Sequence, residues 1–86
     1  MNNDLAPSAI NAALKANWKE AVGINLVILK TDPNNIDALN RLARAHAELG
    51  DMNQARQTAQ SVLKIDPFNS IATKSTAKWK NLKKGD

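Results

Sequence analysis

The sequence of 86 residues contains no cysteine and only one histidine, His46. Disulfide scaffolds and thiolate metal sites are therefore excluded, and a lone imidazole has no second imidazole with which to share a metal. Tyrosine is also absent, and aromatic residues make up only 3% of the chain. We therefore expect a core of aliphatic side chains and alanine, with neither a metal nor a cofactor.

Long hydrophobic runs and reactive motifs are missing as well. No apolar run reaches the roughly 18–20 residues that cross a bilayer, and residues 1–5 lack the basic start and apolar stretch of a secretory signal. There is no glycine-rich phosphate loop and no nucleophile paired with a base. We predict a cytoplasmic protein that is not an enzyme and does not contact membranes.

A chain of this length forms one domain with a thin core, because small chains bury a smaller fraction of their surface. Hydrophobic residues make up 43% and charged residues 23%, a balance typical of folded proteins. The net charge of +4 is unevenly placed: residues 1–69 carry seven basic and seven acidic residues, whereas residues 70–86 carry five lysines and one aspartate. The positive excess therefore lies in the C-terminal segment.

The chain repeats itself at an offset of 34 residues. Segment 32–35 returns as segment 66–69 with the same Asp-Pro pair and the same final Asn, and nine residues of 2–35 are identical to their counterparts in 36–69. Most of these nine are small or aliphatic and are spaced as one face of a helix requires. The sequence therefore predicts two similar units that share packing positions rather than chemistry.

Each unit is predicted to be a pair of antiparallel helices. In the second unit a helically spaced apolar stripe runs through residues 36–49, and Gly50 ends this helix because glycine accepts a left-handed backbone. Asp51 is the predicted N-cap of the next helix. That helix stops before Pro67, which lacks an amide hydrogen and pushes the preceding residue out of helical geometry.

The first unit follows the same plan with weaker signals. Pro7 is acceptable only in the first turn of a helix, so we expect the opening helix to be short. Ala16 stands where the second unit has Gly50, and we expect Asn17 to take the left-handed turn instead. Asn17 and Glu20 are also a candidate capping box for the following helix.

A fifth helix is expected after Asn69, a predicted N-cap. It has no partner helix, as is typical of the element that covers the last apolar face of a stacked array. The residues predicted to face inward are Ile71, Ala72, Ser75, Trp79 and Leu82.

A helix–turn–helix unit of 34 residues with these features resembles the tetratricopeptide repeat. The second unit carries the family's pattern from Leu39 through Gly50 to Pro67. The first unit is more divergent, because Ser8 replaces the pattern's Leu and Asn25 replaces an aromatic residue or Ala. The resemblance covers nearly the whole chain.

The resemblance implies an all-α fold, a right-handed α-α superhelix (a solenoid) of five antiparallel helices. The chain is then a single domain over residues 1–86. It comprises a first repeat over 2–35, a second over 36–69 and a capping helix over 70–84.

Tetratricopeptide arrays generally bind peptides on a concave surface built by the first helix of each pair, and the resemblance implies such a groove here. The groove would be apolar at its start and basic at its end, and its arginines and lysines can bind carboxylates. We therefore expect a protein or peptide partner with an apolar anchor and acidic residues. The candidate groove residues are Ile10, Leu14, Asn40, Arg41, Arg44, Glu48, Lys74 and Lys78.

The same charges are also compatible with an ordinary solvated helix face, on which Glu48 pairs with Arg44 four residues away. Some family members hold a C-terminal carboxylate with Lys and Asn residues. Ala6 and Ile10 occupy the positions where that set of residues begins, so recognition of this kind is not supported.

An alternative function is self-association into a homo-oligomer through the first unit. The helix over residues 18–31 is apolar around most of its circumference, whereas a two-layer stack needs only one apolar stripe. The candidate residues are Val22, Leu26 and Val27, of which the last two correspond to polar residues in the second unit. Without a partner, they form a modestly apolar surface.

Trp79 among the lysines of the last helix raises the question of nucleic-acid binding, because stacking and positive charge hold single strands. A single Trp on a terminal helix is better interpreted as a packing residue with solvated lysines around it. We therefore do not expect a nucleic-acid partner. His46, which lies in the packing stripe of its helix, is interpreted as a core residue and not as a base.

Overall fold

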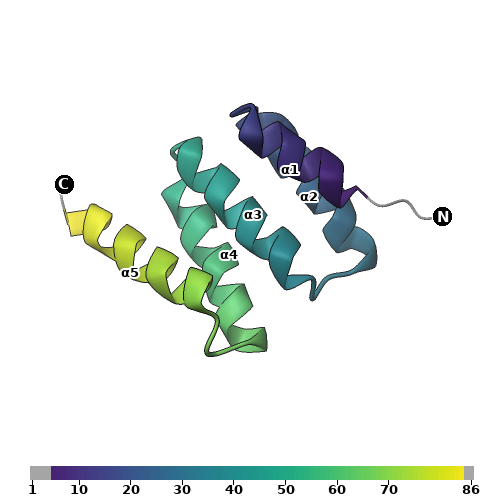
Figure 1. The fold of residues 1–86 in the computed structure, drawn as a ribbon. Coiled ribbons are helices and arrows are strands. Elements are labelled where there is room, and N and C mark those ends of the chain that lie inside the picture. Colours follow the sequence, from purple (N-terminus) through teal and green to yellow (C-terminus); the bar gives the residue numbers. More distant parts are fainter. Residues whose placement is uncertain (1–4, 85–86) are drawn as a thin grey trace.

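The computed structural model describes the backbone of residues 5–84 and the side chains of residues 5–79. The described backbone consists of helices joined by short turns, with no strand among residues 5–84. Successive helices run antiparallel and pack in chain order, and α1 also contacts α3 (Figure 1). The helices are α1 (Ala6–Leu14), α2 (Trp18–Thr31), α3 (Ile36–Glu48), α4 (Met52–Ile65) and α5 (Ser70–Lys84).

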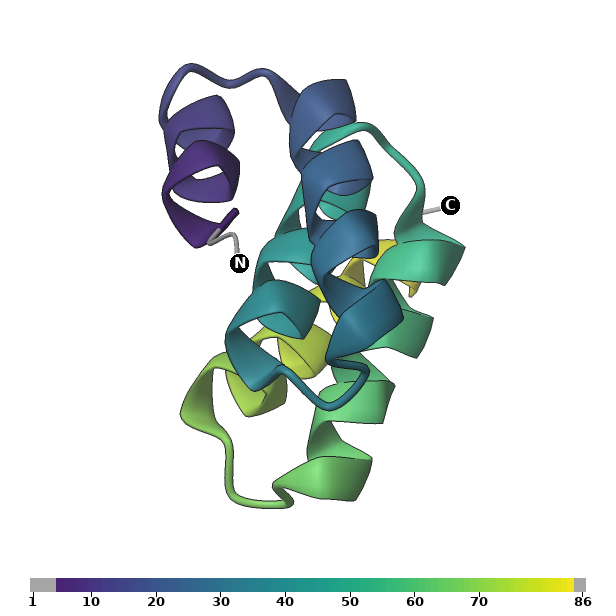
Figure 2. The same ribbon diagram turned by 90° about the vertical axis from the view of Figure 1, so that its right-hand side faces the viewer.

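The helices form two layers. Figure 2 shows α1, α3 and α5 in one layer and α2 and α4 in the other. None of the helices within the described range is long and apolar enough to span a lipid bilayer. The five antiparallel helices expected from the sequence are confirmed.

The hairpin between α3 and α4 closes where the sequence predicts. Gly50 has a φ of 86°, and the amide of Asp51 donates to the carbonyl of His46 at 2.8 Å. The amide of Gly50 itself donates to the carbonyl of Ala47 at 3.0 Å. This pair of bonds satisfies the last carbonyls of α3 and requires a left-handed residue between the helices.

The hairpin between α1 and α2 uses the same backbone pattern without a glycine. The amide of Asn17 donates to the carbonyl of Ala12 at 2.8 Å, and the amide of Ala16 donates to the carbonyl of Ala13 at 2.9 Å. Ala16 has a φ of 58°, whereas Asn17 has a φ of −89°. The prediction that Asn17 takes the left-handed turn is therefore wrong. The hydrogen bond from the Asn17 amide to the Ala12 carbonyl requires the residue before Asn17, which is Ala16, to be left-handed, whatever its side chain.

Two asparagines one repeat apart cap the first helices of successive units. The Oδ1 atoms of Asn35 and Asn69 accept hydrogen bonds from the amides of Ala38 and Ala72, each at 2.9 Å. The predicted N-cap at Asn69 is confirmed. Such caps satisfy an amide that has no partner within its own helix.

The caps predicted for the second helices are not formed by side chains. Neither Asn17 nor Asp51 accepts a backbone amide with its side chain. The Nδ2 group of Asn17 instead donates to Oε1 of Glu20 at 2.9 Å. The predicted capping box at Asn17 is therefore wrong, because its two side chains bond to each other.

Alanine dominates the interface between the layers, as the composition suggested. Small side chains let the backbones of neighbouring helices approach closely. Pro33 and Pro67 lie in the turns that follow α2 and α4, as predicted. The alanines that are at most 4% exposed are Ala9, Ala12, Ala21, Ala38, Ala43, Ala45, Ala55, Ala59 and Ala72.

The inward face of α5 differs in part from the prediction. Ala72 and Trp79 are buried, and the Trp79 ring packs against a cluster that includes Ala43 and Ala55. Ile71 is 58% exposed, so its assignment to the inward stripe is wrong. It lies in the first turn of α5 and lines a surface cavity, whereas its neighbour Ala72 packs with Leu39 and Val62. The side chain of Leu82 lies outside the described residues.

Candidate functional site

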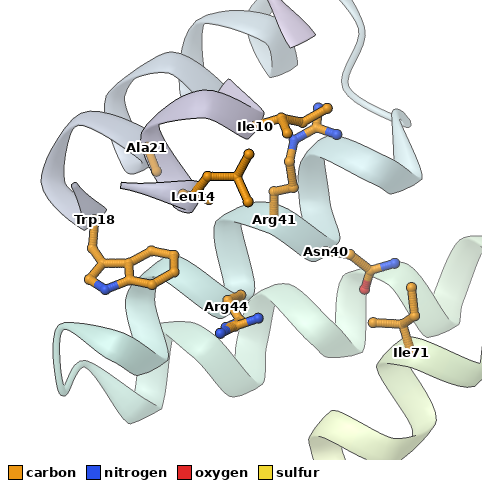
Figure 3. Close-up of a pocket in the computed structure, with 9 residues that line it drawn as sticks. Ile10, Leu14, Trp18, Ala21, Asn40, Arg41, Arg44 and Ile71 are labelled. Carbon is orange, nitrogen blue, oxygen red and sulfur yellow. The ribbon is translucent and has the colours of Figure 1, made fainter. Parts of the chain in front are cut away.

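A cavity of about 570 Å³ opens on the layer formed by α1, α3 and α5. Nine side chains from four helices line it, and we call it the groove cavity (Figure 3). None of these nine is acidic, although two of them are arginines. The nine residues are Ile10, Ala13, Leu14, Trp18, Ala21, Asn40, Arg41, Arg44 and Ile71.

Large apolar side chains stand exposed around this cavity. Ile10 and Leu14 lie one turn apart on α1, and Ile71 lies in the first turn of α5 on the other side of α3. Leu14 is 80% exposed, and Ile10 is about half exposed. When a ligand covers exposed aliphatic side chains beside a hollow, their removal from water favours binding. This part of the groove is suited to an apolar side chain of a partner.

Trp18 forms one wall of the groove cavity from the start of α2. It is half-buried and packs against the cluster of Ala12, Ala21 and Ala45. The guanidinium carbon of Arg44 lies 5.4 Å from the centre of the Trp18 ring, a distance typical of a cation–π contact. Trp18 therefore both packs within its hairpin and holds an arginine of the groove.

Arg44 is held on a second side by Glu48. Its Nε atom donates to Oε2 of Glu48 at 3.3 Å, one turn along α3. Both side chains are well exposed, so the pair stabilises the helix by only a few tenths of a kcal/mol. The Trp18 ring lies against the flat face of the guanidinium, and Glu48 accepts a hydrogen bond from its Nε atom. These contacts leave the two Nη groups of Arg44 for a ligand.

Arg41 is held differently, by a buried amide. Its Nε atom donates to Oδ1 of Asn25 at 3.0 Å, and Asn25 is 0% exposed. The Nδ2 group of Asn25 donates in turn to the backbone carbonyl of Ala21 at 2.8 Å. The bond to Asn25 uses only Nε of Arg41. It leaves the two Nη groups, which form the fork that matches a carboxylate.

A second hollow, of about 290 Å³, lies between α3 and α5. Arg44 lines it as well as the groove cavity, so the two hollows adjoin at this side chain. Glu48 and Lys78 lie on opposite sides of it, and Trp79 forms its buried floor. Because Trp79 is only 6% exposed, its ring does not offer a free face on which a base could stack.

A comparison with protein-family models adds an independent observation. The model of the tetratricopeptide repeat matches residues 19–78, from the first turn of α2 into α5. The chain belongs to the tetratricopeptide-repeat family. No curated protein matches it. Members of this family generally mediate protein–protein interactions and are typically non-catalytic.

The tetratricopeptide-repeat match begins after α1. The assignment of residues 2–35 to a first repeat therefore stays a prediction. It is supported by the backbone turn at Ala16, which repeats the bonding of the turn at Gly50. The all-α repeat solenoid is confirmed, and its right-handed superhelical course stays a prediction.

The structure brings most of the predicted groove residues together. Ile10, Leu14, Asn40, Arg41 and Arg44 line the groove cavity, and Arg44, Glu48 and Lys78 line the hollow between α3 and α5. Lys74 is exposed and lines neither space. Asn40 also contacts the α5 cap, because its Nδ2 group donates to Oδ1 of Asn69 at 3.3 Å.

The sequence interpretation missed three residues that shape the groove of this tetratricopeptide-repeat protein. The sequence assigns Ile71 to packing alone, does not place Trp18 in the groove, and marks Asn25 only as a departure from the family pattern. The signal for Asn25 was present: a polar residue stands where the second unit has Ala59, in the middle of an otherwise apolar helix. A buried polar residue needs a partner, and that partner is Arg41.

The predicted self-association residues lie on α2, in the other layer. Leu26 is 49% and Val27 is 51% exposed. Val22 is half-buried and packs against the same alanine cluster as Trp18, so it contributes to the fold itself. Leu26 and Val27 are therefore the two apolar side chains of this set that α2 presents to solvent, and we call them the α2 patch.

Proposed function

We propose that the layer of α1, α3 and α5 binds an extended segment of a partner protein. An aliphatic side chain of that segment enters the groove cavity beside Ile10 and Leu14. An adjacent carboxylate meets the free Nη groups of Arg41 and Arg44. The observation that carries this proposal is the composition of the cavity wall, which joins exposed aliphatic side chains to two guanidinium groups and no lining carboxylate.

The physical chemistry of the two contacts is complementary. Burying one aliphatic side chain of a partner contributes roughly 1.5–3 kcal/mol, while paired hydrogen bonds from a guanidinium to a carboxylate add direction and a preference for acidic sequences. Lys78 at the far end of the groove adds positive charge that steers an acidic segment towards it. An interaction of this kind needs neither a cofactor nor a catalytic group.

The proposal is tested with a displayed library of random heptapeptides. We expect the wild-type chain to enrich peptides in which an aliphatic residue lies next to Asp or Glu. The Arg41→Glu/Arg44→Glu variant should bind the enriched peptides at least about tenfold more weakly, because two attractive contacts become repulsive. Affinities measured by fluorescence anisotropy on the selected peptides check the magnitude.

The matched control is Lys19→Glu/Lys30→Glu, which changes the net charge by the same amount at two exposed positions of α2. It should leave the peptide affinities close to the wild-type values. Equal weakening in both double variants would show that only overall charge matters. Peptides without acidic residues among the enriched set would contradict the proposed carboxylate contact.

A second candidate function is self-association, and the exposure of the α2 patch favours it. The patch belongs to the layer of α2 and α4, so it leaves the groove free. The two functions are therefore compatible within one molecule. For both, the partner class is protein, and the cytoplasm remains the expected location.

A further inference from the structure

Asn25 is a buried amide in the middle of α2, and its bonds are specific. Its side chain is 0% exposed, its Nδ2 group donates to the carbonyl of Ala21, and its Oδ1 atom accepts from Nε of Arg41. Burying an amide costs free energy unless its donors and acceptors find partners. Removing Arg41 would leave the Asn25 oxygen without this partner, so the two residues form a unit.

The second repeat shows that packing alone does not require an asparagine at this place. The residue one period later is Ala59, which is also 0% exposed. The space between the layers therefore accepts a small apolar side chain at the equivalent position. Arg41 has no counterpart either, since Ser75 stands one period later and Pro7 one period earlier. The amide and the guanidinium thus occur together, once, at the wall of the groove cavity.

An arginine in a groove loses side-chain rotamer entropy when a ligand immobilises it, and this loss weakens binding. A bond from Nε to a buried oxygen restrains the guanidinium plane before any ligand arrives. A neutral amide makes this bond without cancelling the charge, whereas a carboxylate in its place would compete with the ligand. The bond to Asn25 leaves Nη1 and Nη2 of Arg41, the pair of donors from which a carboxylate accepts hydrogen bonds.

We propose that Asn25 is a positioning residue, which holds the Arg41 fork ready for a partner's carboxylate. The proposal rests on the proposed function of the groove and extends it to a residue that the ligand does not touch. Because preorganisation lowers the ordering cost of binding, the benefit applies to acidic ligands and not to apolar ones. Asn25 therefore contributes to the groove's preference for acidic sequences.

The test compares two capped tetrapeptides, Leu-Asp-Leu-Asp and Leu-Asn-Leu-Asn, as probes. Under the proposed function the wild-type chain prefers the Asp peptide. In Asn25→Ala, which introduces the side chain of Ala59, this preference should fall by between about twofold and tenfold, while the affinity for the Asn peptide stays unchanged. In Asn25→Asp the preference should fall further, because the new carboxylate neutralises Arg41.

Two controls separate positioning from stability. Thr58→Ala removes another largely buried side chain that bonds to its own helix, through the carbonyl of Gln54, away from the groove. It should leave the Asp-to-Asn preference unchanged. The Nε–H resonance of Arg41, followed by ¹⁵N NMR without ligand, should be protected from exchange in the wild type and lose that protection in Asn25→Ala.

Asn25→Asp keeps the size of the buried side chain and covers the case in which Asn25→Ala folds poorly, and a double-mutant cycle tests the coupling of the two residues where Asn25→Ala folds. Arg41→Lys changes the partner from the groove side and removes the Nε donor while keeping the charge. The preference should drop in Arg41→Lys, and adding Asn25→Ala should lower it no further.

Each remaining outcome has one meaning. A wild-type chain that binds both peptides equally contradicts the proposed carboxylate contact of the groove. A wild-type preference that survives intact in Asn25→Ala, or an Arg41 Nε–H that stays protected there, overturns the positioning role alone.

Discussion

At the scale of single residues, the turn at Ala16 stores backbone strain. Ala16 holds a φ of 58°, where an L-residue other than glycine suffers a clash between its Cβ atom and the neighbouring carbonyl. The turn persists because the amides of Ala16 and Asn17 satisfy carbonyls at the end of α1. The hydrogen bonds of the hairpin therefore impose this conformation on an unfavourable residue.

We predict that Ala16→Gly raises the free energy of unfolding by about 0.5–1 kcal/mol. The relief of the left-handed clash, about 1–2 kcal/mol, exceeds the cost of the more flexible unfolded chain. Urea denaturation followed by circular dichroism measures the change. Gly50→Ala is the matched control and should destabilise by a similar amount. A Cβ atom at Gly50 meets nothing within 4 Å, so any loss there comes from the backbone alone.

The two turns also show which residue-level features the sequence can predict. Gly50, Pro33 and Pro67 act through their own backbone chemistry, and each marks the predicted helix end. Ala16 has no such chemistry. Its conformation follows from the bonds of its neighbours, so the prediction based on the better left-handed residue, Asn17, named the wrong position.

At the scale of the helices, the contact between α3 and α4 depends on side-chain size. Ala55 is 0% exposed and belongs to the cluster of Ala43, Ala59 and Trp79. The cluster has one large member, and alanines fill the rest of it. A larger side chain at Ala55 therefore has to push either Trp79 or the whole of α4 outwards.

We predict that Ala55→Leu costs roughly 1–3 kcal/mol of stability through overpacking. Thermal unfolding followed by circular dichroism gives the loss, and a change in Trp79 fluorescence reports displacement of the ring. Gln57→Leu, at an exposed position of the same helix, is the control and should shift the melting temperature little. A Leu at position 55 that melts like the wild type would contradict the alanine interface.

The helices also show why only part of the groove could be predicted. The family resemblance together with the repeat spacing placed Ile10, Arg44 and Lys78 on one surface, because residues one period apart occupy equivalent positions in a solenoid. Trp18 and Ile71 escaped this reasoning. They lie in the first turns of α2 and α5, where the face that is exposed depends on the direction in which the preceding turn orients the helix. That orientation is a tertiary property and leaves no periodic signal.

At the scale of the whole molecule, the solenoid is thin. Its principal extents are 44 × 27 × 17 Å, so few side chains lie far from solvent. A two-layer slab of this kind exposes two separate surfaces, one on each layer. The groove cavity uses the layer of α1, α3 and α5, and the α2 patch lies on the other. Substitutions on one surface should therefore leave the other surface's binding unchanged.

The double variant Leu26→Gln/Val27→Ser tests this independence. It gives α2 the side chains that stand one period later, Gln60 and Ser61, both of which are exposed in α4. We expect the variant to bind groove peptides with wild-type affinity, because neither residue lines the groove cavity.

The same variant decides whether the α2 patch mediates self-association. If it does, sedimentation equilibrium should show the average mass of the wild type rising with concentration, while the mass of the variant stays at that of one chain. Removing two half-exposed aliphatic side chains from a symmetric contact removes them from both copies, so the loss of dimerisation free energy is doubled. A wild-type mass of 9.4 kDa that stays constant up to millimolar concentration would leave the groove as the molecule's binding surface and the α2 patch as ordinary exposed surface.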